Sequence, residues 1–403
     1  MFIQSSVGRS QEVDAFSAGQ EAARQAMGGL KDKTPADIKL ILVFSSVVFD
    51  QNKMLSGVRS ITENIPLLGC SSAGEITTAG PSKKSVVVMA IATDSVTFNL
   101  AMGGNIKEDA LAAGRTLAEG LKAVSSDGKL AIMLPDGLAG NGADIVRGLQ
   151  QVLGENFPIV GGAAGDDFLF KETYEYYNDQ VLTGVVIGAM LGGEMKIGIG
   201  VRHGWQPIGP PRKVTKSKGA VLYELDGKPA VQVYEEYFGK KAEELKSEPL
   251  ARLAITYPLG LRIAHSDEYL IRDPITVGES GELTCAAEVP EGAEINLMMG
   301  SRENAIDAAR QAAERCLEEI KEQGGNQVTT AIVFNCIARS KVLGRDAQKE
   351  IDAIKKVLGE SAQLVGFYTY GEQAPIGAKN CSCGRSCKSE FCNETVVILG
   401  FGE

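Results

Sequence analysis

Short apolar runs recur along the chain in one repeated order with helical and turn segments. The repeated pattern is an apolar strand, a stretch with helical spacing, a second strand ending in a glycine-rich turn, and a third apolar strand. The strands and helical stretches of the three copies cover residues 40–44, 54–61 and 86–92, then 130–134, 145–153 and 181–190, then 331–334, 351–358 and 396–401. Such repetition predicts an α/β fold with mixed sheets, built by duplication of a strand-helix-strand unit.

The glycine-rich turns are the most regular part of the repeat, at residues 66–76, 158–167 and 364–372. Each has apolar residues, a glycine, a short run of small or aromatic residues, a second glycine and a carboxylate. Glycine tolerates positive φ and close approach of other groups. We expect the three turns to converge on one polar pocket, whose candidate ligand-binding residues are Cys70, Ser71, Ser72, Glu75, Asp166, Tyr368, Tyr370 and Glu372. Alternatively, the carboxylates accept hydrogen bonds from turn amides or face water.

The remaining pattern predicts helices at 11–29, 107–123 and 303–322 and a mainly antiparallel section between residues 255 and 299. Asp226-Gly227 before Pro229 marks a turn between a strand at 221–225 and a helix at 230–238. We therefore divide the chain into a domain of residues 1–225 and a domain of residues 226–403.

Composition narrows the class of protein. The chain has 403 residues, 44% of them hydrophobic, and a formal net charge of −10. The negative charge and the lack of a dense basic cluster exclude a nucleic-acid surface. No signal-peptide pattern opens the chain, and the apolar runs are shorter than the roughly 20 residues of a membrane helix. We expect a cytoplasmic protein with no membrane insertion.

Four of the eight cysteines lie within one loop, at residues 379–392. Cys381, Cys383, Cys387 and Cys392 place four thiols within twelve residues, which suits an iron–sulfur cluster or a tetrahedral zinc ion. Iron–sulfur is slightly favoured because the paired Cys-x2-Cys knuckles of structural zinc sites are absent. The alternative is a loop of free or reversibly oxidised thiols, a redox switch without metal.

Two further groups are candidate ligand-binding residues. Asn335, Cys336 and Arg339 follow a core strand, where binding groups of α/β sheets often lie. Arg339 suits a carboxylate or phosphate, although a salt bridge for Arg339 and a core position for Cys336 are the more common roles. His203 and Trp205 lie on a Gly/Pro-rich turn, where His203 ligates haem, lines the pocket or has a structural role.

A hydrolase is the enzymatic alternative. Residues 69–73 nearly match a nucleophile elbow, and Ser71, Asp166 and His203 occur in hydrolase order. The elbow requires a helix directly after the serine, whereas this chain turns at Ala73-Gly74-Glu75. We therefore expect no enzymatic activity, with a metal- or cluster-dependent enzyme as a further alternative.

The chain resembles the FIST family of sensory proteins, which combine a FIST N and a FIST C domain. The matching segments occur in the family's order, at residues 68–75, 160–166, 204–209, 225–230, 334–339 and 366–372. The resemblance implies signal transduction by a small-ligand sensor, with amino acids as proposed ligands and a kinase or chemoreceptor as the signalling partner.

Some family members bind haem and respond to nitric oxide. The chain departs from the family at Phe391-Cys392-Asn393, where the family often has a histidine in place of Cys392. Few axial ligands then remain, so we do not expect haem. The sequence therefore predicts a small-ligand sensor with a four-cysteine metal or iron–sulfur site that makes it redox- or gas-responsive.

Overall fold

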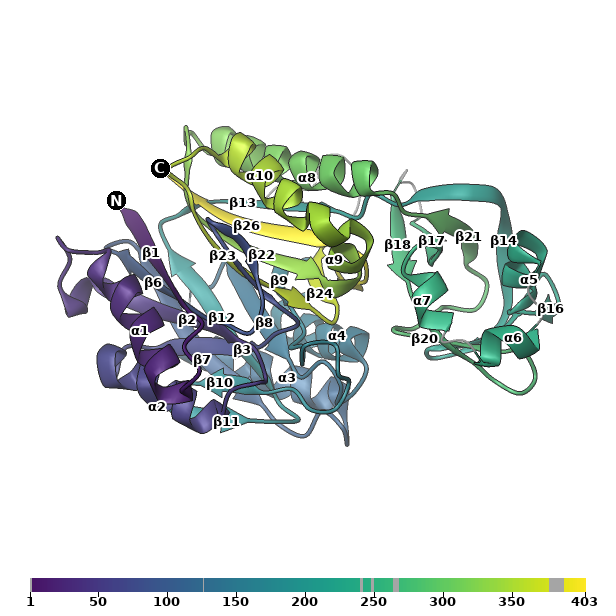
Figure 1. Cartoon of the computed structure of the whole chain (residues 1–403), viewed down its shortest axis with the longest axis horizontal. Helices are drawn as coiled ribbons and strands as arrows, with labels where there is room; N and C mark the ends of the chain where they lie inside the picture. The colour runs from purple at the N-terminus through teal and green to yellow at the C-terminus, as the bar shows by residue number, and fades with distance from the viewer. Residues whose placement is uncertain (1, 126, 240–241, 248–249, 264–267, 377–387) are drawn as a thin grey trace.

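Three copies of one structural unit follow each other along the chain, and a small domain is inserted into the third copy (Figure 1). The computed structural model describes residues 2–125, 127–239, 242–247, 250–263, 268–376 and 388–403. No helix within these ranges is long and apolar enough to cross a membrane. We call the three copies together the three-sheet body, and the inserted residues 203–300 the distal domain.

Each copy supplies an edge strand, a first core strand, a glycine strand, a two-stranded hairpin and a last strand. In the first copy these are β1 (Ile3–Ser10), β2 (Ile38–Ser45), β3 (Leu67–Ser71), β4 (Glu75–Thr77), β5 (Gly80–Ser82) and β6 (Val86–Thr93). In the second they are β7 (Val96–Gly103), β8 (Leu130–Pro135), β9 (Ile159–Gly162), β10 (Glu175–Tyr177), β11 (Gln180–Leu182) and β12 (Val186–Gly193). In the third they are β13 (Lys196–Arg202), β22 (Val328–Cys336), β23 (Gln363–Thr369), β24 (Glu372–Pro375), β25 (Ser389–Cys392) and β26 (Val396–Gly402).

The three copies exchange their hairpins in a cycle. Within each copy the first core strand pairs in parallel with the glycine strand and antiparallel with the last strand. The hairpin instead joins the sheet of another copy: β4 pairs with β23, β10 with β3, and β24 with β9. The result is three sheets of six strands each, in which every sheet depends on two copies.

Helices cover the outer faces of the three sheets (Figure 1). The first sheet carries α1 (Ala15–Gly28) and α2 (Gln51–Thr62), the second α3 (Ala110–Val124) and α4 (Gly142–Leu153), and the third α8 (Arg302–Glu322) and α10 (Ala347–Leu358). A side chain accepts a hydrogen bond from a backbone N–H in the first turn of five of these helices: Asp14, Asp50, Asp109, Asn141 and Ser301. These residues stabilise the helix starts.

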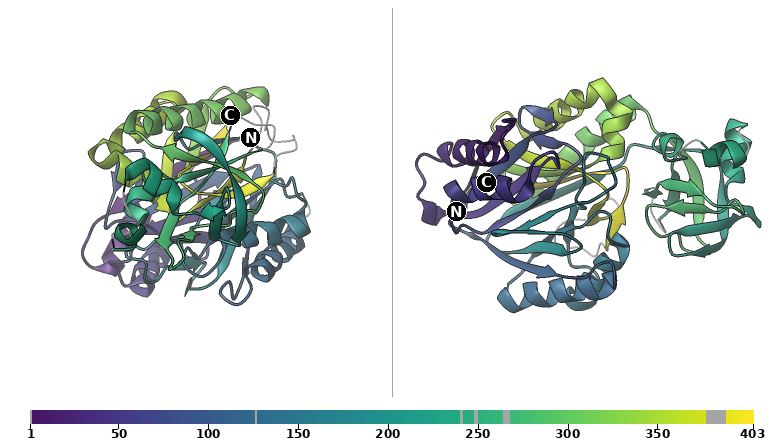
Figure 2. Two further views of the ribbon diagram at one scale, coloured as in Figure 1. Left: turned by 90° about the vertical axis from the view of Figure 1, so that its right-hand side faces the viewer. Right: turned by 60° about the horizontal axis from the view of Figure 1, so that its bottom comes forward.

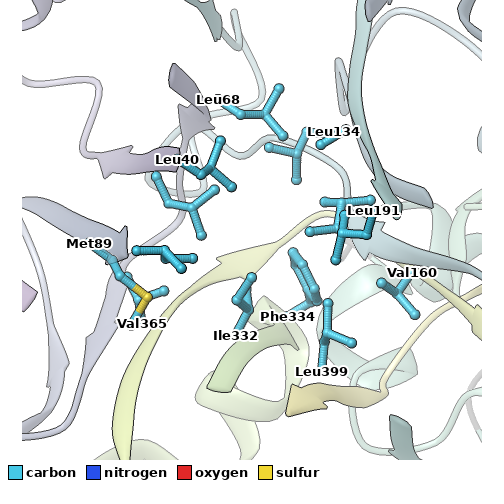
Figure 3. Packing of buried hydrophobic residues seen from close by; sticks show 14 of the residues in the cluster. Leu40, Leu68, Met89, Leu134, Val160, Leu191, Ile332, Phe334, Val365 and Leu399 are labelled. Atoms are coloured by element: carbon cyan, nitrogen blue, oxygen red, sulfur yellow. The ribbon is translucent and has the colours of Figure 1, made fainter. Parts of the chain in front are cut away.

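The inner faces of the three sheets share one apolar core. Figure 3 shows side chains from all three sheets pointing toward one another, among them Leu40, Leu134 and Phe334. Phe44 and Phe367, from different sheets, stack with their ring centroids 4.5 Å apart. The space between the sheets is therefore packed with side chains.

Equivalent glycines allow the parallel strands of each copy to approach closely. A Cβ atom at Gly69, Gly161 or Gly366 would lie about 2 Å from the carbonyl oxygen of Val43, Met133 or Val333, respectively. No side chain fits at that distance, so glycine is required at this position for a steric reason.

The distal domain leaves the three-sheet body after β13 and returns to it before α8, and it stands at one side of the molecule (Figures 1 and 2). Its strands are β14 (Gln206–Lys218), β15 (Val221–Leu225), β16 (Lys228–Pro229), β17 (Leu259–Arg262), β18 (Tyr269–Arg272), β19 (Pro274–Val277), β20 (Leu283–Cys285) and β21 (Glu294–Met299). Its helices are α5 (Gln232–Phe238), α6 (Ala242–Ser247) and α7 (Leu250–Ala254). All of its strand pairs are antiparallel.

The predicted α/β fold with mixed sheets and repeated units is confirmed, as is the antiparallel section between residues 255 and 299. The predicted turn at Asp226-Gly227 joins the paired strands β15 and β16 of the distal domain. Arg339 lies in α9 (Ile337–Leu343), which begins directly after β22.

Candidate functional site

The three glycine-rich turns meet at one end of the three-sheet body and bond directly to each other. Gly165 N donates to Ser71 O, Ala73 N to Tyr368 O, and Tyr370 N to Ala163 O. Three further bonds return around the ring, from the backbone N–H groups of Ser71, Tyr368 and Ala163 to the carbonyls of Tyr174, Gly74 and Gly371. The predicted convergence of the turns is thus observed, and the turns close on their own backbone groups.

Two of the turn carboxylates are buried in equivalent hydrogen-bond networks. Glu75 accepts hydrogen bonds from the Ser72 hydroxyl and from the hydroxyl and backbone N–H of Ser85. Glu372 accepts them from the Thr369 hydroxyl and from the hydroxyl and N–H of Thr395.

Both carboxyls are 0% exposed. Burial raises the pKa of each to about 8, although the hydroxyl hydrogen bonds act in the opposite direction. These two side chains are therefore parts of the core, protonated over much of the neutral range.

Glu175 occupies the third equivalent position, where the sequence suggested Asp166. Glu175 begins the exchanged hairpin of the second copy, as Glu75 and Glu372 begin those of the first and third. Residues 166–173 are an insertion that separates Glu175 from its turn. The sequence does contain a signal for this equivalence, namely the spacing to the last strand of each copy. Glu175 precedes Val186 by the same number of residues as Glu75 precedes Val86.

Glu175 lacks the hydroxyl partners of its two equivalents. Ala164 stands in place of Ser72, and Val185 in place of Ser85. Neither carboxyl oxygen of Glu175 has a hydrogen-bond partner among the described residues. The backbone N–H of Val185 opposes part of the rise in the pKa of Glu175. Burial, and then the charge of Asp136, raise the pKa of Glu175 well above its ordinary value.

Asp166 instead organises the insertion that follows it. Its carboxylate accepts hydrogen bonds from the backbone N–H groups of Leu169, Phe170, Lys171 and Glu172 and from the Tyr370 hydroxyl. It is 1% exposed. This arrangement matches the alternative role in which a turn carboxylate bonds to turn amides.

The residues around the other turns are equally enclosed. The Ser71 hydroxyl donates to Gly165 O at 2.7 Å and accepts from Tyr174 N at 2.9 Å. Cys70 is 0% exposed, and burial raises the pKa of its thiol. Ser72 is also 0% exposed, Tyr368 is 2% exposed, and Tyr370 is partly buried.

Ser71, Asp166 and His203 do not form a catalytic arrangement. Within the described residues, the hydrogen bonds of Ser71 go to the backbone of Gly165 and Tyr174, and those of Asp166 to the residues named above. His203 Nδ1 accepts from the backbone N–H of Trp205 at 3.0 Å. No bond joins any two of the three, so this geometry does not activate the serine.

Arg339 is a fully buried structural cation, with 0% exposure. Its guanidinium forms an ion pair with Glu350 at 2.6 Å and donates to the backbone oxygens of His203, Ala305 and Glu394. Asn335 Nδ2 donates to the same Glu350 at 2.7 Å. Cys336 is 4% exposed, and burial raises the pKa of its thiol. This matches the structural alternative considered for the segment.

A cavity of about 210 Å³ lies where the distal domain joins the three-sheet body. His203 and Trp205 are the two predicted site residues in its wall; the others are Val201, Arg202, Gly204, Gln206, Pro207, Glu268, Tyr269, Asn304, Asp307, Ala308, Gln311, Ile376 and Thr395. Thr395 connects this junction cavity to the Glu372 network.

The charged groups at the junction cavity have both signs. Arg202 forms an ion pair with Glu268 at 3.1 Å, and the Arg202 side chain is one-third exposed. Asp307 is half-exposed and pairs with Arg310 at 2.7 Å. Burial, and then the charges of Arg339 and Arg202, lower the pKa of His203 to about 4. His203 is therefore neutral at pH 7, and with Nδ1 accepting from Trp205 its proton is on Nε2.

A second buried acidic pair lies where Asp273 of the distal domain meets Glu394 of the three-sheet body. Burial raises the pKa of Asp273 to about 7 and that of Glu394 well above its ordinary value. Neither carboxyl oxygen of Glu394 has a hydrogen-bond partner among the described residues, and the charge of Asp273 adds to the effect of burial on the pKa of Glu394. The sequence offered no signal for this pair, because its members are far apart along the chain.

Of the four clustered cysteines, Cys392 alone lies within the described residues. It is 0% exposed in β25, its thiol donates to Glu390 O at 3.4 Å, and burial raises the thiol pKa. Over the described part of the chain, no group of three or more His, Cys, Asp or Glu residues could hold a metal ion.

Comparisons with known families match most of the chain. The FIST N domain model matches residues 39–228, and the FIST C domain model matches residues 230–375. An uncharacterized protein of Mycobacterium tuberculosis (strain H37Rv) is 26% identical over 388 residues, which cover 93% of this chain and 95% of the relative. An uncharacterized protein of Methanocaldococcus jannaschii is 27% identical over 204 residues, 48% of this chain and 40% of the relative.

Among solved structures, a chorismatase and a cyanuric acid hydrolase from A. caulinodans are each 10% identical to this chain. Both alignments cover all of both chains, with TM-scores of 0.37 and 0.35. Likeness at this level carries no conclusion about the fold or the activity.

Proposed function

The chain belongs to the FIST family, and from this premise we propose that it is a sensor that binds a small zwitterionic ligand, such as an amino acid, in the junction cavity. FIST domains are associated with sensory and signal-transduction proteins that bind small ligands. The observation that carries the proposal is the position of the cavity, whose wall combines residues of the three-sheet body with residues of the distal domain.

The size and charges of the cavity support an amino acid. Drug-sized pockets usually enclose about 300 to 1,000 Å³, so a cavity of about 210 Å³ suits a smaller molecule. Arg202 presents a planar guanidinium to a ligand carboxylate, while Asp307 and Glu268 supply negative charge for a ligand amine. The indole of Trp205 and the side chains of Pro207 and Ile376 provide apolar contacts.

Signal transfer follows from the two-sided wall. β13 and α8 carry the body side of the cavity, and Gln206 and Tyr269 belong to the distal domain. A ligand that contacts both sides favours the arrangements in which the two sides are correctly spaced, which is a population shift. A separate signalling protein, such as a kinase or chemoreceptor, would respond to that shift.

The experiment is a thermal-shift and calorimetric screen of the full chain against the twenty amino acids, their decarboxylated amines and their deaminated acids. We expect at least one amino acid to bind, with the corresponding amine and acid at least tenfold weaker. Arg202→Ala should weaken binding at least tenfold. Arg262→Ala is the matched control, because Arg262 lies outside the cavity, half-exposed beside Glu294. Absence of binding by every amino acid, or equal loss in both variants, contradicts the proposal.

A metal or iron–sulfur centre on the four-cysteine loop is a second proposal, and the spacing of Cys381, Cys383, Cys387 and Cys392 supports it. Bound iron–sulfur would make the protein redox- or gas-responsive. Anaerobic protein should contain stoichiometric iron and sulfide, or zinc, and Cys383→Ser should lose it. Cys316→Ser is the control, since that thiol is buried against Gly198 O at 3.3 Å. Metal-free, folded anaerobic protein would exclude the centre, leaving a thiol switch.

A further inference from the structure

The insertion of residues 166–173 distinguishes the second copy from the other two, and its tip is exposed and apolar. Leu169 is 54% exposed and Phe170 is 57% exposed. In the first and third copies the equivalent turns pass directly from Ala73 to Gly74 and from Tyr370 to Gly371. The exposed side chains therefore belong to an added segment and are not a remnant of the shared fold.

The backbone of this insertion is held in an unfavourable conformation. Asp167, Phe168 and Phe170 have φ angles of 55°, 69° and 53°, in the left-handed region that bulky residues rarely adopt. Four backbone hydrogen bonds to the Asp166 carboxylate maintain this shape. Backbone strain that the surrounding structure maintains is typical of functional segments.

Aromatic contacts attach the tip to the three-sheet body. Phe170 stacks on Tyr370 with ring centroids 5.0 Å apart, and Phe168 lies 4.8 Å from Phe170. Two further exposed apolar residues border it: Val48, 54% exposed, and Leu138, 39% exposed. Ser46 Oγ bonds both to Asp167 and to the Val48 amide, while Gly137 packs close to Tyr370. We call Val48, Leu138, Leu169 and Phe170 the apolar patch.

Lysines lie within the insertion and against its aromatic side chains. Lys341 Nζ lies 4.1 Å from the centroid of the Phe168 ring. Partial burial, and then the charge of Lys83, lower the pKa of Lys341. Lys84 interacts with Asp167, and Lys171 follows Phe170 directly. The insertion also carries two carboxylates beside these lysines: Asp167 accepts a hydrogen bond from the Ser46 hydroxyl, and Glu172 accepts one from the Tyr174 hydroxyl.

We propose that the apolar patch and its lysines form a docking surface for a partner protein, which binds through an acidic segment carrying apolar side chains. A cluster of exposed apolar groups marks an interaction site, and the lysines beside it favour a partner with negative charge. The formal net charge of −10 opposes approach of the whole chain to an anionic membrane or to nucleic acid. A second copy is disfavoured, because a two-fold contact would bring the same lysines together.

The test uses the full chain and two fluorescent peptides. One peptide has Leu and Phe at helical spacing among Glu residues, and the other has Lys in place of every Glu. We expect the acidic peptide to bind at least tenfold more tightly, as measured by anisotropy, with an affinity that falls as salt rises. The double variant L169S/F170N should weaken binding at least tenfold. Asparagine tolerates the positive φ at position 170, so the backbone is preserved.

Two further variants complete the design. K83E/K341E should reverse the preference in favour of the basic peptide. Ile275→Ser is the matched control, since Ile275 is a 44% exposed residue of the distal domain, and it should bind like the unmodified chain. Equal binding of both peptides, no binding of either, or binding that L169S/F170N leaves unchanged would overturn the proposal. Binding to anionic vesicles that depends on Phe170, without binding of the acidic peptide, would overturn the proposal in favour of a membrane surface. Self-association that depends on Phe170, again without peptide binding, would overturn it in favour of a second copy of the chain.

Discussion

The second copy of the repeated unit differs from the first and third at one buried position. Glu75 and Glu372 each bond to two hydroxyl groups, whereas Glu175 has no hydrogen-bond partner among the described residues. The same copy carries the insertion that presents Leu169 and Phe170. One copy therefore has a weaker internal network and a new external surface.

This difference separates what the fold requires from what one copy has added. All three copies keep the ring of backbone hydrogen bonds and the glycine that admits a neighbouring strand. The hydroxyl partners are not shared by all three copies, since Ala164 and Val185 stand in their place in the second copy. The contribution of this buried acid to the free energy of unfolding should therefore differ between the copies.

Removing each of the three glutamates should give the largest contrast. Glu372→Leu leaves two hydroxyls and an amide N–H buried without an acceptor. Glu75→Leu leaves the Ser72 hydroxyl and the Ser85 N–H without an acceptor, while the Ser85 hydroxyl keeps Ser82 as a partner at 2.9 Å. We expect each substitution to lower the free energy of unfolding by roughly 2 to 3 kcal/mol. Glu175→Leu removes a buried carboxyl that has no hydrogen-bond partner among the described residues. It should therefore change the free energy of unfolding by less than about 1 kcal/mol. Urea unfolding followed by circular dichroism at pH 7 measures all three. Equal losses would show that the three positions are energetically alike.

Stability should fall as the pH rises. The folded pKa values of Glu75 and Glu372 are about 8, above the ordinary 4.5, so the folded state binds more protons than the unfolded state between these values. The stabilisation from these two carboxyls is fully present below about pH 4.5 and decreases as the pH rises to about 8. We expect a loss of about 5 kcal/mol between pH 6 and pH 9, to which the two carboxyls contribute equally.

The control for this pH dependence is E75Q/E372Q, which mimics the protonated acids at every pH. Its free energy of unfolding should change less over the same interval. Asp273, with a pKa of about 7, adds to the loss in both proteins, so the difference between them isolates the two turn carboxyls. A double variant as pH-dependent as the unmodified chain would exclude the assignment.

Asp166→Ala should disrupt the insertion and leave the ring of turns intact. The insertion is largely exposed, so water replaces part of the lost hydrogen bonding and the expected cost is roughly 1 to 2 kcal/mol. Amide hydrogen exchange should increase at residues 169–172 and remain slow at Ala73 and Tyr368. Faster exchange at the ring as well would show that the insertion supports the turns.

Restoring one hydroxyl to the second copy should have the smallest effect. Val185→Thr is nearly isosteric and places a hydroxyl where Ser85 and Thr395 have theirs. We expect a gain of about 1 kcal/mol in the free energy of unfolding at pH 6. Val86→Thr is the control, since it buries a hydroxyl beyond the turn and should destabilise. A destabilised V185T would show that Glu175 points away from residue 185.

Much of the fold follows from local patterns. The apolar runs and helical spacings predicted the order of strands and helices in all three copies. They did so because the spacing of apolar residues along an element indicates which face of that element is buried. The role of Gly69, Gly161 and Gly366 could also be inferred from the sequence. A glycine inside a strand indicates that another part of the backbone approaches the strand closely at that position.

The candidate sites were less accessible to sequence reasoning. Proximity of the three turns was predicted, but their closure by mutual hydrogen bonds was not, because an open and a closed turn have the same sequence signature. Arg339 illustrates the limit: its position after a core strand suits a ligand, yet Glu350 and three carbonyl oxygens from distant segments enclose it.

The sequence alone therefore determined the repeated α/β unit, the antiparallel section and the membership of the FIST family. Tertiary structure decided that hairpins are exchanged among the copies, that Glu175 and not Asp166 is the third equivalent acid, and that His203 and Trp205 border a cavity. The reason is physical. Periodicity and turn chemistry act between neighbours in the chain, whereas burial, charge pairing and enclosure arise between residues that only the folded chain brings together.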